Sequence, residues 1–322
     1  MPHTDPLQRA SPAAPDPPLG LQGTSASTLA REIVRLMRDF SVELTPAELA
    51  RRASCPAGLP AGSRVCVPWI AGARFEQTLH AVVRLRELGL VPVPHLAVRA
   101  IADAAALQRI LAELWREAAV DHALLIAGSQ AVPVGTIDNT VHALAAGLFE
   151  RHGMRSLGLA AHPEGSPDIG ADALALALHE KNAYAATRRL QMHLVTQFCF
   201  TAEPIVAWER SARAAGNRLP VHVGLAGLAS LPTLIKYARS CGVGASIGAL
   251  TRQAGRLLKL ASAVHPGELV VAVARARLAD PQCRFERLHF FPFGSTDATV
   301  AWAAAVAAGD FVLRRDNTDL SV

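Results

Sequence analysis

The stretch FSVELTP, residues 40–46, alternates between apolar and polar side chains and then reaches a proline. Positions 40, 42 and 44 are apolar and would share one face of a strand, while positions 41, 43 and 45 are polar and would share the other. Glu43 carries the only charge in this stretch. An edge strand could hold such a carboxylate on its solvent-exposed face, and a barrel strand could hold it at the end where barrel enzymes place their active sites. The remainder of the chain decides between these two alternatives.

Short apolar runs of the same kind recur along the chain and give eight predicted strands. They are residues 40–44, 63–70, 90–96, 122–128, 156–162, 194–200, 220–227 and 287–293. Stretches with helical spacing lie between them, at 74–89, 102–118, 140–153, 171–191, 203–216, 231–242 and 296–309, with one further helical region at 247–278. A helix at 27–40, with Ser27 or Thr28 as its N-cap, precedes the first strand. This alternation predicts an α/β fold, a (β/α)8 TIM barrel with extra helices.

An open doubly wound sheet is the alternative fold. It would need a glycine-rich phosphate turn after its first strand, and FSVELTP leads into no such turn. We find no internal repeat and no interior linker, so residues 26–322 are predicted to form a single barrel domain. Residues 1–25 are rich in proline and are predicted to be a disordered tail.

Composition narrows the class of function. The chain has 322 residues and a net charge of +5, but no basic stripe with interleaved aromatic residues, so a nucleic-acid partner is not expected. Its five cysteines form no CxxC pair, which argues for a reducing cytoplasm and against structural zinc. No apolar run reaches the length of a membrane span, and the N-terminus lacks the apolar core of a signal peptide. The apolar stretch 296–309 would allow a homo-oligomer without requiring one.

Polar residues and glycines gather where the predicted strands end, and barrel enzymes place their chemistry at these ends. In chain order the ends are Glu43, Pro68, His95, Gly128–Ser129, His162, Gln197, Gly224 and Phe293–Gly294. Each has a plainer interpretation as well. His95 could be a hydrogen-bonded core histidine, and Gln197, predicted to lie in a buried strand, could pair with a neighbouring loop. No HExxH, GxSxG or phosphate-loop motif is present, so no metal site is predicted.

The ordered series FSVELTP, PHL, AGSQAVPVG, AAHPEGSPD, VTQFCF, PVHVGLAG, CGV and HFFPFG resembles the methylenetetrahydrofolate reductase family, between about residues 38 and 308. AAHPEGSPD and VTQFCF form the most specific pair, and the chain looks closest to the divergent bacterial branch of the family. These proteins are flavin-dependent (β/α)8 barrels. The resemblance implies a cytoplasmic flavoprotein of one-carbon metabolism or methionine biosynthesis, with FAD, an NAD(P)H electron donor and a folate substrate.

The resemblance also implies roles for individual residues. Glu43 matches the acid that protonates the folate nitrogen, and desolvation at its strand end is expected to raise the pKa of its carboxyl. The other matches are Gln197 and Leu231 for the folate, and His95, Gly128, Ser129, His162 and Ser166 around the flavin. Lys181 matches a lysine on the FAD pyrophosphate, and its plainer interpretation is a solvated helix lysine.

Several positions depart from the family pattern. Ala127-Gly128-Ser129 stands where the family has an Arg-Gly-Asp or Gly-Gly-Asp sequence, and Pro68 stands where a threonine is common. His162 replaces a tyrosine, Ser166 a histidine, and Leu231 falls near the aromatic residue over the folate.

Three hypotheses follow from the resemblance and its departures. The first is an oxidoreductase interconverting 5,10-methylene- and 5-methyl-tetrahydrofolate by flavin-mediated hydride transfer. The second is a non-reducing or flavin-independent folate-binding protein, possibly a subunit of a demethylation complex. The third is a folate-dependent methyl transferase.

Overall fold

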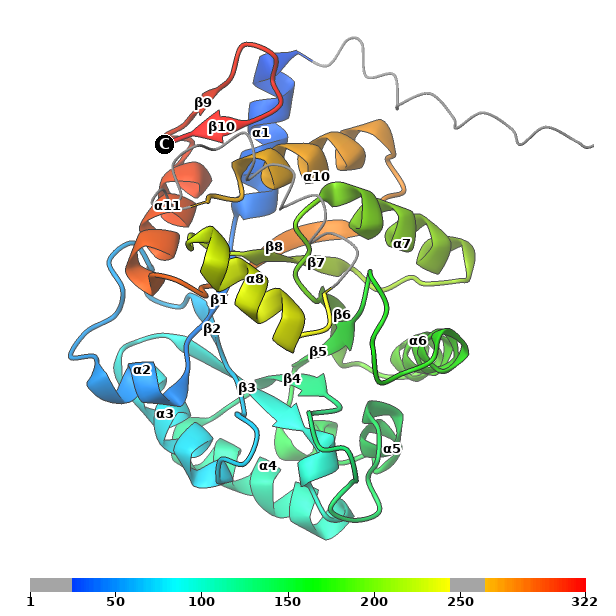
Figure 1. Cartoon of the computed structure of the whole chain (residues 1–322). Coiled ribbons are helices and arrows are strands. Elements are labelled where there is room, and N and C mark those ends of the chain that lie inside the picture. Colours follow the sequence, from blue (N-terminus) through cyan, green and yellow to red (C-terminus); the bar gives the residue numbers. More distant parts are fainter. Residues whose placement is uncertain (1–24, 244–263) are drawn as a thin grey trace, which may run out of the picture.

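The structure is a computed structural model that describes residues 25–243 and 264–322 (Figure 1). The predicted tail, residues 1–25, lies outside these residues except for Ser25. The first part of the helical region predicted at 247–278 also lies outside them, and its later part forms α10 (Gly267–Ala279).

Eight parallel strands close into a barrel in which each strand pairs with the next one along the chain. Their bounds are β1 (Ser41–Glu43), β2 (Arg64–Val67), β3 (Val91–Ala97), β4 (His122–Ile126), β5 (Ser156–Ala161), β6 (Gln191–Thr196), β7 (Val221–Ala226) and β8 (Phe285–Phe291). Strand β1 pairs with β2 on one side and with β8 on the other, which closes the ring. The predicted (β/α)8 barrel is therefore confirmed, and the open-sheet alternative is wrong.

Helices surround the barrel (Figure 1). They are α1 (Ala26–Met37), α2 (Pro46–Arg51), α3 (Phe75–Glu87), α4 (Ala104–Ala118), α5 (Thr140–Ala145), α6 (Ala171–Ala186), α7 (Ala202–Ala214), α8 (Leu231–Ser240), α10 and α11 (Thr296–Ala308). Two short 3-10 turns, η1 (Val98–Ala100) and η2 (Glu150–His152), and a hairpin of β9 (Val312–Leu313) with β10 (Leu320–Ser321) complete the described chain.

Some predicted bounds are wrong for local reasons. The helix predicted at 140–153 ends at Ala145, because Gly147 adopts a φ of 65° that interrupts helical geometry before η2 begins. Helix α1 is capped by Ser25, whose side chain accepts from the backbone of Thr28, and not by Ser27 or Thr28. Strand β6 ends at Thr196, so Gln197 follows the strand and is not buried within it.

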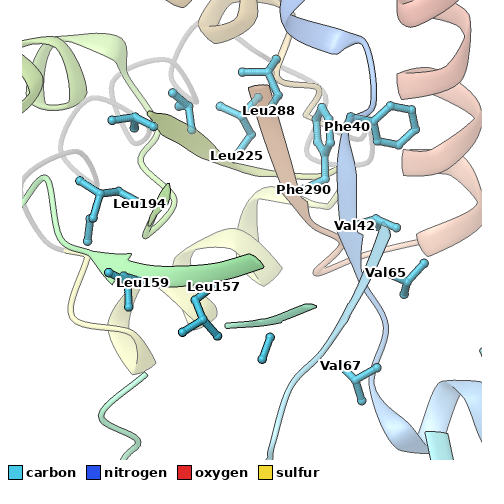
Figure 2. Close-up of a cluster of buried hydrophobic side chains, with 14 of the residues drawn as sticks. Phe40, Val42, Val65, Val67, Leu157, Leu159, Leu194, Leu225, Leu288 and Phe290 are labelled. Atoms are coloured by element: carbon cyan, nitrogen blue, oxygen red, sulfur yellow. The ribbon is translucent and has the colours of Figure 1, made fainter. Parts of the chain in front are cut away.

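The main hydrophobic core lies between the sheet and the helices. Figure 2 shows ten labelled members of this core, drawn from the N-terminal approach to β1 and from β1, β2, β5, β6, β7 and β8. Val42 is one of them and is fully buried. Because successive strand side chains point to opposite faces, its neighbours Ser41 and Glu43 point into the barrel. The alternation in FSVELTP thus separates an apolar outer face from a polar inner face.

No helix among residues 25–243 and 264–322 is long and apolar enough to cross a membrane. All five cysteines are free thiols.

Candidate active site

Glu43, the last residue of β1, faces two histidines from other strands. Its Oε1 atom lies 3.2 Å from Nε2 of His95 on β3 and 3.5 Å from Nε2 of His289 on β8. The Glu43 side chain is 16% exposed, against 8% for His95 and 1% for His289. Neither Nε2 atom has the geometry of a hydrogen bond to a partner, so both histidines interact with Glu43 electrostatically. The carboxylate therefore lies at the boundary between the barrel interior and its rim.

The electrostatics of Glu43 differ from the sequence-based expectation. Burial alone would raise the pKa of its carboxyl, but the charges and close contacts of His95 and His289 outweigh burial and lower it from the ordinary 4.5 to about 2. The expected rise of this pKa is wrong because the sequence did not place two imidazoles against one carboxylate. At neutral pH, Glu43 is ionised in this arrangement.

Ser41 fixes the ring of His289. Ser41 precedes Glu43 by two residues on the same face of β1, and its Oγ lies 2.8 Å from Nδ1 of His289. The register of the barrel explains this contact, since Ser41 pairs directly with His289. With one ring nitrogen on Ser41 and the other facing Glu43, the imidazole is held from both ends.

The barrel interior toward the N-terminal ends of the strands is also rich in histidine. A cavity of about 20 Å³ there is lined by Ser41, His289, His122, His193, His222 and others. The rings of His193 and His222 stack at 4.0 Å, and His222 Nε2 contacts Glu286 Oε2 at 3.1 Å. Burial lowers the pKa of both His193 and His222, so these two rings favour the neutral form.

No three His, Cys, Asp or Glu side chains of residues 25–243 and 264–322 are grouped as a metal ion would require. An open groove of about 940 Å³ lies elsewhere, between α1 and the C-terminal segment 309–317. None of the strand-end residues lines that groove.

An aromatic wall extends outward from His289. We define this wall as Phe198, Phe200, Phe291, Phe293 and Tyr237. The ring of Phe291 meets His289 edge-on at 4.7 Å, and Phe293 stacks on Tyr237 at 4.3 Å. Tyr237 is 37% exposed, so the wall runs from the buried histidine to solvent. Such a wall offers flat apolar faces to a flat heteroaromatic ligand.

The folate residues predicted from the sequence lie after β6 and in α8. Gln197 directly follows β6, and its Oε1 accepts from the backbone N–H of Phe198, the first member of the aromatic wall. Leu231 is the first residue of α8 and packs against the same aromatic cluster. Gln197 thus forms its hydrogen bond with the next residue in the chain, and not with a neighbouring loop as the alternative predicted.

Apart from His95 on β3, the residues predicted to surround a flavin lie after β4 and β5. Gly128 has a φ of 94°, and a Cβ there would approach Ala97 Cβ at 3.1 Å, so the position requires glycine. Ser129 is exposed. Ser166 accepts from the backbone of Asp168 at 3.3 Å within the loop after β5. These residues stand apart from the Glu43 contacts, in which His95 alone of the predicted flavin residues takes part.

Lys181 is buried, which makes the solvated-lysine interpretation wrong. It reaches from α6 to the backbone of β5, where its Nζ donates to the carbonyl oxygen of Ala160 at 3.0 Å. Burial lowers its pKa to about 8. His162, just after β5, has a pKa lowered first by burial and then by the nearby charge of Lys181. No acidic side chain among the described residues forms an ion pair with this ammonium.

Sequence reasoning missed His289, Ser41 and the aromatic wall. The signal was present in the last strand, where His289 and Phe291 alternate with buried outward residues. Ser41 could have been found in the same way, because it shares the inner face with Glu43.

Comparison with known proteins supports the fold. No family model matches the chain. Among solved structures, the chain is similar to an uncharacterized protein from Clostridium thermocellum described as binding two copies of 5-methyl-5,6,7,8-tetrahydrofolic acid. The TM-score is 0.54 and the identity 11%, over 87% of this chain and 97% of that chain. The carboxyl transferase domain of Rhizobium etli pyruvate carboxylase matches with a TM-score of 0.45 and 9% identity, over 88% of this chain and 48% of that chain.

Proposed function

We propose that this protein binds a tetrahydrofolate derivative at the C-terminal ends of the barrel strands and moves a proton between Glu43 and a nitrogen of the folate. The observation that carries the proposal is the contact of Glu43 with His95 and His289, next to the aromatic wall. The wall offers a face to a pterin ring, and the carboxylate lies at the inner end of that face. Gln197 and Leu231 adjoin the same wall and would contact the ring.

The structural neighbour supports a folate ligand. The Clostridium thermocellum protein shares the barrel along nearly its whole length and is described as binding 5-methyl-tetrahydrofolate. The strand-end motifs of this chain resemble a folate-dependent family independently of that neighbour. Two separate lines of support therefore name the same class of ligand.

In its finer form, the proposal is the interconversion of 5,10-methylene- and 5-methyl-tetrahydrofolate with NAD(P)H as electron donor. Protonation of the folate nitrogen opens the five-membered ring, and one hydride then completes the methyl group. Because Glu43 is ionised at neutral pH, it would first take up a proton and then pass it to the folate nitrogen. We place the reaction in the cytoplasm, which the five free thiols support.

Lys181 and His162 are the residues that fit a flavin phosphate. Among the described residues, the buried ammonium of Lys181 has only a carbonyl partner, which is costly, and an anionic group beside it would offset part of that cost. When bound, FAD supplies hydride transfer. The protein itself contributes the positions of Lys181 and His162. It also contributes a position without a side chain, Gly128, where a ligand can approach the backbone.

A second candidate is a folate-binding protein without flavin, which could serve as a subunit of a demethylation complex. The loop after β4 favours it, because Ser129 is exposed and uncharged where the family carries an aspartate. Gln130 also crowds this loop, since a Cβ at Gly128 would lie 2.9 Å from its Oε1.

Two measurements on the purified full chain test these proposals. Calorimetric titration with 5-methyl-tetrahydrofolate should show saturable binding, and p-aminobenzoyl-glutamate, which lacks the pterin, should bind far more weakly. Absence of saturable binding would refute the folate proposal. A flavin absorption spectrum that NAD(P)H bleaches would support the reductase. Saturable folate binding by a protein that takes up no FAD would favour the second candidate.

A further inference from the structure

The N-terminal end of the barrel interior is lined with basic side chains. The register of the strands explains part of this arrangement, since His222 of β7 pairs with Arg287 of β8, and its ring stacks on that of His193 of β6 at 4.0 Å. Arg64 of β2 and His122 of β4 line the same small cavity as these two stacked histidines. Strands from all around the barrel therefore contribute a guanidinium or an imidazole to this one end.

Most of these basic groups already have an acidic partner. The contacts are Arg287 with Asp39 at 3.5 Å, His222 with Glu286 at 3.1 Å and His122 with Asp121 at 2.7 Å. Arg64 differs, because its guanidinium forms neither a hydrogen bond nor an ion pair with any residue that the structure describes. The pKa of Arg64 is lowered first by burial and then by the charge of Arg287, which together outweigh the opposite effect of nearby carboxylates. Arg64 is therefore a half-buried cation beside a second cation, with no carboxylate in contact.

The stacked histidines feel the same uncompensated charge. Burial comes first among the causes that lower the pKa of His193, followed by the charges of its neighbours His222 and Arg64. Burial also lowers the pKa of His222, against the opposing contact with Glu286. Among the described residues, none forms a hydrogen bond with the ring of His193. The N–H group of that ring is therefore available to a further acceptor.

We infer that this cavity binds one small inorganic anion of the chloride class, held between the Arg64 guanidinium and the rings of His193 and His222. The volume of the cavity is about 20 Å³, which has room for about one water-sized particle. A single-atom anion is close to that size, whereas sulfate and phosphate are too large. The anion would accept hydrogen bonds from Arg64 and His193, and its charge would offset a cation that no described carboxylate contacts. Binding of this anion is independent of the proposed folate chemistry.

Asp39 also lines the cavity and would repel an anion. Its side chain is 64% exposed and lies 3.5 Å from Arg287, so water and a guanidinium both weaken its field inside the cavity. A water molecule would fill the same volume without offsetting the charge of Arg64. A dependence on the charge of the occupant therefore distinguishes a bound anion from a bound water.

Anion binding is expected to be coupled to protonation of the two stacked histidines. Without an anion, both have pKa values below the ordinary 6.5, so the unfolded chain binds protons more readily than the folded one. The free energy of unfolding then falls as the pH drops through about 6.5. An anion beside the rings favours their cationic forms and raises these pKa values. Chloride should therefore bind more tightly, and stabilise the fold more, as the pH falls.

The charged and titratable groups around the two rings come from each element packed against them. They are Asp39 before β1, Arg64 and Cys66 of β2, Asp121 and His122 at the start of β4, and Glu286, Arg287 and His289 of β8. The thiol of Cys66 stays neutral, because burial raises its pKa well above the ordinary value. The carboxylates in this set each contact a basic group, which leaves Arg64 as the charge that an anion would offset.

Thermal unfolding of the full chain in sodium chloride and in sodium gluconate, at equal ionic strength, tests for the bound anion. Gluconate screens charges as chloride does but is too large for the cavity. At about pH 6, raising chloride from about 10 mM to about 0.5 M should raise Tm by about 2 °C or more above the gluconate series. At about pH 8 the difference should be smaller, because the histidines are then neutral.

Proton NMR of the histidine rings gives a second readout. The signals that disappear in His193→Gln identify His193. In the wild type, replacing gluconate by chloride should move the titration midpoint of His193 to higher pH, because an anion stabilises the protonated ring.

Variants locate the site. Arg64→Gln should abolish the chloride effect on Tm, and it should raise the His193 midpoint in gluconate, since a repelling charge is lost. A purely structural role of Arg64 would not move that midpoint. If Arg64→Gln does not fold, His193→Gln is the deciding variant and should weaken the chloride effect. Arg74→Gln is the matched control, because it removes the same charge from a side chain that is 80% exposed, and it should behave as the wild type.

Equal Tm values in chloride and gluconate at about pH 6 would mean that the cavity holds water only, and would overturn the inference. A chloride effect that persists undiminished in both Arg64→Gln and His193→Gln, or that Arg74→Gln also abolishes, would place the anion elsewhere and overturn it as well.

Discussion

At the scale of single residues, Glu43 shows what a sequence pattern can predict and what it cannot. The position of Glu43 at the end of the first strand follows from the alternation in FSVELTP, and its place on the inner face of the barrel follows from the burial of Val42. The state of its charge does not follow, because His95 and His289 lie 52 and 246 positions away in the chain. Their approach reverses the direction of the pKa shift that burial alone would give.

Replacement of Glu43 by glutamine tests its role as the acid. Glutamine keeps the shape of the side chain but carries no transferable carboxyl proton, so Glu43→Gln should abolish turnover of methylene-folate while folate binding and folding persist. Stopped-flow or steady-state assays with NAD(P)H, together with calorimetric titration, measure the two effects separately.

Glu286→Gln is the matched control, because Glu286 also pairs with a histidine, His222, but lies 45% exposed at the far end of the barrel. It should keep its turnover. Near-normal turnover in Glu43→Gln would show that Glu43 is only a strand-end residue and that the proposed mechanism is wrong.

At the scale of elements, strands and long helices were predicted well and short segments poorly. The eight strands were found because their apolar runs are long enough to show against the helical stretches. Helix α2 was not predicted, although it starts directly after Glu43 and is defined by local bonds. Thr45 accepts from the backbone of Glu48, and Glu48 Oε2 accepts from the backbone of Thr45 at 3.0 Å, a reciprocal capping box.

The cap of α2 is expected to contribute measurably to stability. Thr45→Ala removes the side-chain half of the box, and we expect the free energy of unfolding to fall by about 1 kcal/mol. Glu48 also accepts from Thr296 at 2.7 Å and so joins α2 to α11. Urea denaturation gives the change as a lower midpoint at constant slope. Thr45→Ser, which keeps the hydroxyl, should lie close to the wild type; equal midpoints for all three proteins would contradict the assignment.

At the scale of the whole molecule, a buried ammonium couples stability to pH. Lys181 has a pKa lowered from its ordinary 10.5 to about 8 because of burial. Between these two values, the unfolded chain binds a proton at Lys181 that the folded chain has released. Raising the pH through this window therefore favours the folded state.

Lys181→Met removes this titration and keeps an unbranched side chain. Between about pH 8 and 10.5, the free energy of unfolding of the wild type should rise relative to that of the variant, by up to about 3 kcal/mol. Denaturation of both proteins across this range, without added flavin, measures the difference. Lys236→Met, which removes an exposed lysine from α8, is the control and should show no such trend. A flat difference for Lys181→Met would mean that Lys181 is not held buried as an ammonium in solution.

The sequence by itself determined the barrel, the ends of its strands and the position of Glu43. These depend on periodicity and on the order of the elements, which are local properties of the chain. Only the tertiary structure decided which side chains meet: His289 beneath Glu43, Ser41 on its ring, the aromatic wall beside them, and Lys181 against Ala160. Closure of the barrel sets β1 against β8, and no pattern within either strand records which residue of one will face which residue of the other.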